Sequence, residues 1–148
     1  SGGRPKTMIL LRDNAMQKIV EDAERSYPNE ACGLLLGERR GPDVHVASVH
    51  VSGNLSRTPR THFEVDPQLR FDLERMAREK SLEVVAVYHS HPNGMAKPSE
   101  VDLSKAWEPG LVWIIAALKS GRVTDQRAYR IAIPKIEFME INIQTKSD

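Results

Sequence analysis

The stretch of this sequence that most constrains the fold joins an apolar run to two closely spaced histidines. The residues from Val84 to Val87 are all apolar, which is typical of a buried strand. This strand is predicted to end in His89-Ser90-His91, where alternating side chains direct both imidazoles to the same side. Pro92 then favours an extended strand end. The chain is therefore expected to fold around a strand that presents two imidazoles at its end.

A helix start follows this strand after a turn at Asn93-Gly94. Pro98 and Ser99 are typical of a helix N-terminus, and they place Asp102 in the first helical turn. Two imidazoles and one carboxylate form the three-ligand set of a catalytic zinc site, which leaves the fourth position for water. The spacing therefore indicates a metal centre between the strand end and the helix start.

A second interpretation of the same residues is structural. Ser99-Glu100-Val101-Asp102 has the form of a capping box, in which the two side chains only satisfy backbone donors. A single histidine is also more often structural than a ligand. The two histidines and the capping box together favour the metal site, and Ser99 can cap the helix while facing that site.

These residues resemble a known family. The segment His89-Ser90-His91-Pro92, with ten residues between His91 and Asp102 and Pro98-Ser99 before the aspartate, is similar to the JAMM/MPN+ zinc metallopeptidases. The segment Pro28–Gly37 resembles the glutamate-bearing segment of that family, especially in its prokaryotic members. The resemblance extends from about Met8 to the region of Leu118.

The resemblance implies both a fold and a mechanism. It implies the Mov34/MPN fold, an α/β structure with a curved mixed sheet flanked by helices and related to cytidine deaminases. It implies one zinc per chain, held by His89, His91 and Asp102. It also implies that Glu30 is the general base toward a zinc-bound water, and that Ser99 donates to the developing oxyanion. The expected enzyme is a zinc-dependent peptidase or isopeptidase.

The resemblance further implies a protein substrate. Prokaryotic members act on ubiquitin-like or sulfur-carrier proteins of the β-grasp fold and cut after a C-terminal Gly-Gly. The family's ubiquitin-gripping insertions look short here, around 54–61 and 107–111. Release of cysteine or a peptide from a sulfur carrier is therefore the first expectation, and isopeptide cleavage is the second. A catalytically inactive MPN scaffold is the alternative, although all five site residues are present.

Composition bounds the remaining possibilities. The 148 residues suit one domain, expected over 7–145, with residues 1–6 as a tag remnant or disordered N-terminus. A net charge of +1 gives no argument for a nucleic-acid or membrane partner. The longest apolar run, Leu111 to Leu118, is too short to span a bilayer. The oligomeric state stays open, with a homodimer as one option.

Cys32 is the single cysteine, so an internal disulfide and a Cys-rich zinc finger are excluded. A zinc nucleobase deaminase is excluded as well, because it needs a Pro-Cys-x-x-Cys segment. A lone thiol suits a cytoplasmic location. Cys32 as a nucleophile is the thiol alternative, but its apolar neighbours indicate a buried residue at a strand start.

Hydrophobic periodicity predicts the other elements. Asp13 is the expected N-cap of a helix reaching about Tyr27, and Asp66-Pro67 begins a second helix. The helix that follows Ser99 is expected to end at about Trp107. The expected strands, besides the central one, cover 7–11, 32–37, 44–51, 62–65, 111–118, 124–133 and 136–143. This order predicts a mixed sheet between helices.

Overall fold

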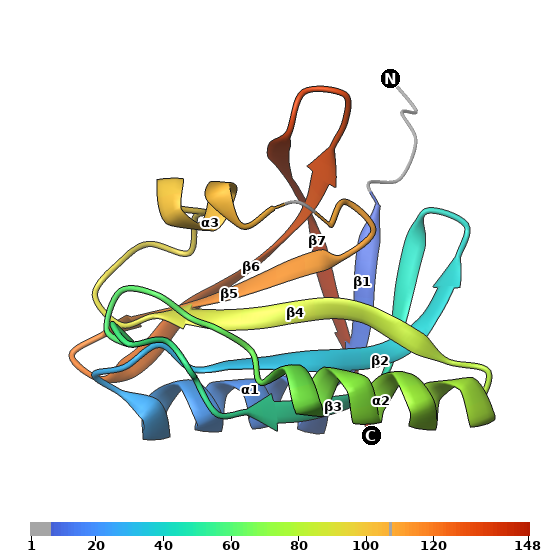
Figure 1. Cartoon of the computed structure of the whole chain (residues 1–148), viewed down its shortest axis with the longest axis horizontal. Helices are drawn as coiled ribbons and strands as arrows, with labels where there is room; N and C mark the ends of the chain where they lie inside the picture. The colour runs from blue at the N-terminus through green and yellow to red at the C-terminus, as the bar shows by residue number, and fades with distance from the viewer. Residues whose placement is uncertain (1–6, 107) are drawn as a thin grey trace.

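Within residues 7–106 and 108–148, which the computed structural model describes, seven strands and three helices follow one another (Figure 1). They are β1 (Met8–Arg12), α1 (Asp13–Ser26), β2 (Cys32–Arg40), β3 (Asp43–Ser52), α2 (Pro67–Glu79), β4 (Glu83–His91), α3 (Glu100–Ser104), β5 (Val112–Lys119), β6 (Arg122–Ala132) and β7 (Glu137–Lys146). None of the helices in these ranges is long and apolar enough to cross a membrane.

The strands form one mixed sheet that closes on itself in the order β1-β3-β2-β4-β5-β6-β7. β1 closes it, because it pairs in parallel with β3 on one side and with β7 on the other. β4 and β5 are also parallel, while the remaining pairs are antiparallel. The α/β class and the curved mixed sheet predicted from the sequence are confirmed.

Each face of the sheet carries its own apolar cluster. On β5, Ile114 packs on the same side as Ile19 of α1, whereas the neighbouring Ile115 packs on the same side as Leu73 of α2. Side chains alternate between the two faces along a strand, so a strand buried on both faces must be apolar throughout. This explains the continuous apolar runs of the central strands.

β4 carries both histidines of its C-terminal end, as the sequence predicted. His89 is fully buried and belongs to the face covered by α2 and α3, where it contacts Phe63 and Trp113. The short helix α3 lies over the end of this strand (Figure 1). The fold therefore places the histidine pair and the start of α3 at one end of the sheet.

Two local predictions are wrong. Asp13 is the first helical residue rather than the N-cap, because Arg12 takes that position and the side chain of Asp148 accepts a hydrogen bond from Asn14 N. Residues 62–65 do not form a strand beyond one isolated bridge at Val65. Their backbone groups bond instead to the side chain of Asn54.

The third helix differs in length from its prediction. It ends at Ser104, and Lys105 is its C-cap. The predicted end at Trp107 lies outside the described residues, as does the expectation of a tag remnant over residues 1–6. β2 also continues to Arg40, so the turn that follows is confined to Gly41-Pro42.

Candidate metal centre

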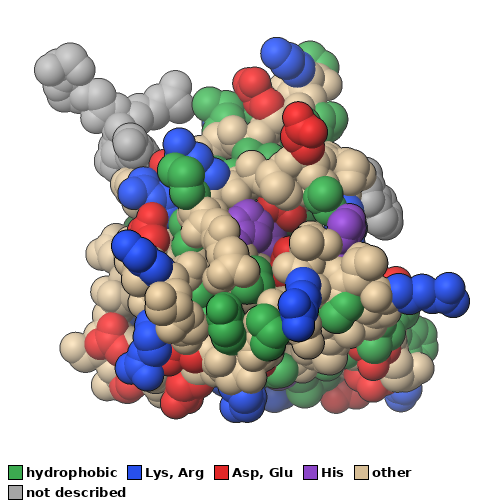
Figure 2. Space-filling view, turned by 90° about the vertical axis from the view of Figure 1, so that its left-hand side faces the viewer, with side chains coloured by type: hydrophobic (Ala, Val, Ile, Leu, Met, Phe, Trp, Pro, Cys, Tyr) green, Lys and Arg blue, Asp and Glu red, His purple; other side chains and the backbone are tan. Residues whose placement is uncertain are grey.

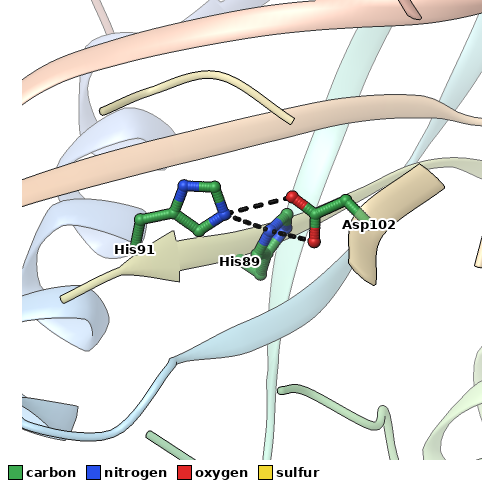
Figure 3. Close-up of side chains that lie close together, drawn as sticks. All are labelled: His89, His91 and Asp102. Carbon is green, nitrogen blue, oxygen red and sulfur yellow. Dashed lines mark hydrogen bonds and ion pairs between the residues drawn. The ribbon is translucent and has the colours of Figure 1, made fainter. Parts of the chain in front are cut away.

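Three side chains converge at the end of β4. His89 Nε2 lies 3.0 Å from Asp102 Oδ1, and His91 Nε2 lies 3.1 Å from Asp102 Oδ2 (Figure 3). The two Nε2 atoms are 3.1 Å apart. Atoms bound tetrahedrally to one ion at about 2.0–2.1 Å lie about 3.3–3.4 Å from one another. The donor atoms therefore already have nearly the spacing that one small divalent cation requires.

Contacts with the surrounding protein fix the orientation of both imidazole rings. His91 Nδ1 lies 2.8 Å from the Met95 carbonyl oxygen, which accepts a hydrogen bond from this nitrogen and leaves Nε2 to face the carboxylate. The ring of His89 stacks on Phe63, with centroids 4.4 Å apart, and the edge of Trp113 packs against it at 5.4 Å. Both ligand nitrogens are thus directed to the same point.

Electrostatics favour an ionised carboxylate at Asp102 and a neutral ring at His89. Burial raises the pKa of Asp102, but hydrogen bonds with His89 and His91 outweigh it and hold the pKa well below its usual range. Burial lowers the pKa of His89. For His91, burial also lowers the pKa, but hydrogen bonds to Asp102 and the Met95 carbonyl reverse the shift. A carboxylate and buried imidazoles can hold a metal ion.

The capping box and the donor set are the same residues. Ser99 Oγ accepts a hydrogen bond from Asp102 N at 3.0 Å, and Asp102 Oδ2 accepts one from Ser99 N at 2.9 Å. Asp102 is 3% exposed, which a purely structural cap does not require. The two interpretations of this segment are therefore compatible, because the cap also fixes the carboxylate that faces the histidines.

Glu30 lies just before β2, opposite His91 at the end of the neighbouring strand β4. Ser90 N donates to the Ala31 carbonyl and Ser90 Oγ accepts from Ala31 N, so the β2–β4 register continues to Glu30. Glu30 is 6% exposed, and its Oε1 atom has no hydrogen-bond partner among the residues described. Burial raises the pKa of Glu30 to about 7, which the charge of His91 partly opposes. A carboxyl group with this pKa can exchange a proton near neutral pH.

Comparisons with known proteins decide the family. The family model described as prokaryotic homologs of the JAB domain matches residues 12–132. The chain belongs to this JAB-domain family. It is 32% identical to a desampylase of Haloferax volcanii over 76% of this chain and 79% of that protein.

Two further relatives are similar over nearly the whole chain. The chain is 26% identical to the CysO-cysteine peptidase of Mycobacterium tuberculosis over 92% of this chain and 91% of that protein. A solution structure of a protein from Desulfitobacterium hafniense superposes with a TM-score of 0.81 and 31% identity, covering 95% of this chain and 94% of that one. The resemblance seen in the sequence is therefore confirmed.

The JAB domain also carries a cleft beside the metal centre. Its volume is about 970 Å³, and its floor includes Leu34, Val87 and Trp113. The loop 54–65 and the start of α2 form one wall, and Lys105, Glu108 and Leu111 line the other. In Figure 2, histidine and acidic side chains lie in a hollow on the face at the end of β4, with apolar and basic side chains around it.

Sequence reasoning missed two residues that hold this site together. Asn54 Nδ2 donates to the Glu30 carbonyl at 3.0 Å and to the His62 carbonyl at 2.9 Å, and its Oδ1 accepts from two backbone N–H groups. Lys105 Nζ donates to the Phe63 carbonyl. The contacts of Asn54 with Glu30 and of Lys105 with Phe63 join segments far apart in the sequence, so no local pattern indicated them.

The remaining histidines and the cysteine lie outside the donor cluster. His62 lines the cleft, whereas His45 and His50 belong to β3. Cys32 is fully buried, and burial raises the pKa of its thiol to about 12. A thiol that is neutral and inaccessible does not suit a nucleophile.

Proposed function

We propose that this JAB domain is a zinc-dependent peptidase or isopeptidase. Its substrate would be the amide bond after the C-terminal Gly-Gly of a ubiquitin-like or sulfur-carrier protein of the β-grasp fold. The family membership and the names of two relatives, a desampylase and a CysO-cysteine peptidase, support a peptidase acting on such conjugates. A purely scaffolding role is disfavoured because Glu30, Ser99 and the three donor residues all lie together.

The metal would be zinc, one ion per chain, held by His89, His91 and Asp102. Two imidazole nitrogens and one carboxylate oxygen are a usual zinc donor set, and three protein ligands leave a position open for chemistry. Zinc bound there would supply a Lewis acid and would make water a nucleophile near neutral pH. The chain's own residues must then manage the protons and the developing charge.

Glu30 is the residue we assign to proton transfer, and its environment is the observation that carries this proposal. Its carboxyl group is buried, has a pKa of about 7 and has one oxygen without a hydrogen-bond partner in the described part of the chain. A carboxylate with this pKa can take a proton from the attacking water and return it to the leaving nitrogen. Burial without a partner costs free energy, so a structural role does not explain it.

Ser99 is the residue we assign to oxyanion stabilisation. Its hydroxyl oxygen already accepts a hydrogen bond from Asp102 N, so the hydroxyl hydrogen is free to donate. A donor fixed by a helix cap needs little reorganisation when negative charge develops on the carbonyl oxygen. The capping geometry therefore supports Ser99 as one preorganised donor beside the carboxylate of Asp102.

The cleft fits an extended C-terminal tail. A wall formed by the loop 54–65 can receive a substrate segment through backbone hydrogen bonds, and glycines fit where that backbone must pass close to the metal. We expect release of cysteine or a peptide from a sulfur carrier as the main reaction, with isopeptide cleavage second. We expect the protein to act in the cytoplasm, where its single thiol stays reduced.

The decisive experiment combines metal analysis with a defined substrate. A β-grasp protein ending in Gly-Gly and extended by one cysteine, by a short peptide or by an isopeptide-linked lysine is incubated with protein of known metal content. We expect cleavage after the second glycine that scales with bound zinc, and strong slowing when this glycine is replaced by valine. Cleavage independent of metal, or equal rates for glycine and valine, would refute the proposal.

A further inference from the structure

The charges that line the cleft are not balanced. Arg70 donates to both carboxylate oxygens of Glu108, at 2.7 and 2.5 Å, and also to Glu74, so this arginine and Glu108 neutralise each other. Two cations of the lining then remain, Arg57 and Lys105, against one acid, Glu64. None of these three takes part in an ion pair among the residues described. The cleft is therefore positive where a substrate tail would lie.

Lys105 lies close to the proposed metal ligands. It is the C-cap of α3, three residues after Asp102, and it is half-buried. Its ammonium group donates to the Phe63 carbonyl and lies 4.8 Å from the centroid of the Phe63 ring. The same ring stacks on His89. The charge of Lys105 and the proposed metal ligand His89 therefore contact the same aromatic ring.

The hydrogen-bond partner of the Lys105 ammonium group is a neutral carbonyl oxygen, although an ammonium can also bind a carboxylate. A charge-assisted hydrogen bond to a carboxylate is roughly twice as strong as a bond between neutral groups. An ammonium has three donor hydrogens, and the Phe63 carbonyl uses one of them. Lys105 can therefore take a carboxylate from a bound chain and keep its place at the cleft wall.

The position of Lys105 selects one residue of the substrate. The ring distances place its ammonium within about 9 Å of the His89 ring, which is under three residues of extended chain at about 3.3 Å each. If the last glycine supplies the carbonyl at the metal, the two glycines offer no side chain. The first side chain in reach of Lys105 is then that of the residue directly before Gly-Gly.

We propose that Lys105 is a specificity-determining residue that selects tails of the form X-Gly-Gly in which X is acidic and rejects those in which X is arginine or lysine. The inference rests on the proposed function, because it takes the tail to lie in the cleft beside the metal centre. It narrows the substrate class from β-grasp proteins in general to those with an acidic residue before the two glycines. Neutral residues at X take an intermediate place.

The test uses one β-grasp substrate with a cysteine extension after Gly-Gly and with Glu, Gln or Arg at X. For the wild-type protein, kcat/KM should be about tenfold higher for Glu than for Arg, as for a close charge pair that is partly exposed. In Lys105→Met the two values should become nearly equal, and in Lys105→Glu their order should reverse. The ratio in the wild type should shrink at high ionic strength.

A matched control and a second readout keep the test decisive. Lys80→Met removes an exposed lysine at the far end of α2 and should keep the wild-type ratio. Binding of fluorescent X-Gly-Gly peptides to zinc-loaded Glu30→Gln protein, followed by anisotropy, should show the same order of affinities without any turnover. A lysine that only supports Phe63 would, on removal, weaken all three substrates equally and leave their ratio unchanged.

The possible failures are distinguishable. Equal affinities for Glu and Arg peptides, no binding of either, or an unchanged ratio in Lys105→Met would overturn the role of Lys105. The zinc-loaded wild type could bind the Glu peptide more tightly than the Arg peptide and still cleave none of the three proteins. That result would refute the proposed peptidase function and would support the selectivity of the cleft.

Discussion

The carboxyl group of Glu30 lies in a buried environment, where ionisation costs free energy. It is buried, one of its oxygens has no hydrogen-bond partner among the described residues, and burial is the main reason that its pKa rises to about 7. Asn54 and Pro59 hold its backbone from the neighbouring loop. A residue fixed in this way contributes more to a reaction than to stability, and two predictions follow from that difference.

Glu30→Gln should keep the metal and lose turnover. Glutamine has nearly the size of glutamate but cannot accept a proton near neutral pH, and general base catalysis contributes about 10²–10⁴-fold to kcat. Zinc content per chain and kcat are measured on the same sample. Glu79→Gln, on the exposed surface of α2, is the matched control and should behave as wild type. Normal turnover in zinc-loaded Glu30→Gln would show that another group is the base.

The same substitution should stabilise the metal-free protein above neutral pH. Because burial raises the pKa of Glu30 from 4.5 to about 7, the folded state favours the protonated form. Its contribution to stability is fully present below about 4.5 and is lost as the pH rises to about 7. Above that pH, Glu30→Gln should exceed wild type by about 3 kcal/mol in free energy of unfolding.

Urea unfolding of both proteins at several pH values measures this difference. The advantage of Glu30→Gln should be small near pH 4.5 and should grow as the pH rises to about 7. An advantage that did not change with pH would mean that the carboxyl group stays protonated throughout this range or is solvated in the folded protein.

Two elements, the end of β4 and the start of α3, supply the donor residues. The strand fixes His89 and His91 on one face, and the capping box fixes Asp102 opposite them. The sequence signals for both elements are local, since a strand alternates its side chains and a capping box closes within four residues. For this reason the spacing in the sequence was enough to predict that the three side chains converge.

Ser99→Ala should separate the cap from the chemistry. Loss of the cap costs about 1 kcal/mol of stability, and loss of one oxyanion donor costs about 10²–10³-fold in kcat. Ser99→Thr keeps a hydroxyl group and should retain most of the activity. Asp102→Ala differs in kind, because it should lose the metal itself. Thermal unfolding, zinc content and kcat are compared for the three variants, and full activity of Ser99→Ala would limit Ser99 to capping.

Gly33 of β2 has no room for a side chain, because the Tyr88 ring from β4 and the His50 carbonyl from β3 fill that space. A Cβ atom there would lie 2.3 Å from Tyr88 Cε2 and 2.4 Å from the His50 carbonyl oxygen. Tyr88 is fully buried and donates to Asp22 at 2.7 Å, so it has little room to move. Gly33→Ala should lower the free energy of unfolding by about 1–3 kcal/mol or more.

Gly53→Ala is the matched control for this prediction, because a Cβ atom at Gly53 meets nothing within 4 Å. Guanidinium unfolding should show a clear loss for Gly33→Ala and little change for Gly53→Ala. Equal stability of the two variants would mean that Tyr88 can shift within the core at little cost.

Sequence reasoning worked where an element depends on local patterns and failed where it depends on distant residues. The central strand and α2 were predicted because apolar periodicity and Asp66-Pro67 are local signals. The predicted strand at 62–65 failed because Asn54 takes its backbone groups. The role of Lys105 was likewise invisible, since its partner Phe63 is far from it in the sequence.

At the scale of the whole molecule, the closed sheet and the apolar clusters on its two faces stabilise the fold, and the metal centre is not needed for this. β1 closes the sheet by pairing with β3 and β7, which leaves no strand edge along that seam. The ligand side chains are also held by protein groups such as Phe63, the Met95 carbonyl and Ser99 N. The fold should therefore persist without zinc, unlike small domains that depend on a structural metal.

Removal of the metal should thus abolish hydrolysis while leaving the fold intact. A chelator such as phenanthroline should stop turnover, the far-ultraviolet circular dichroism should hardly change, and added zinc should restore activity. Iodoacetamide should have little effect on the zinc-loaded enzyme, because Cys32 is fully buried and burial raises the pKa of its thiol to about 12. Loss of the circular dichroism signal on chelation would show that the fold depends on the metal. If alkylation abolished turnover and the chelator had no effect, Cys32 would be the catalytic group in place of a metal bound by the histidine pair.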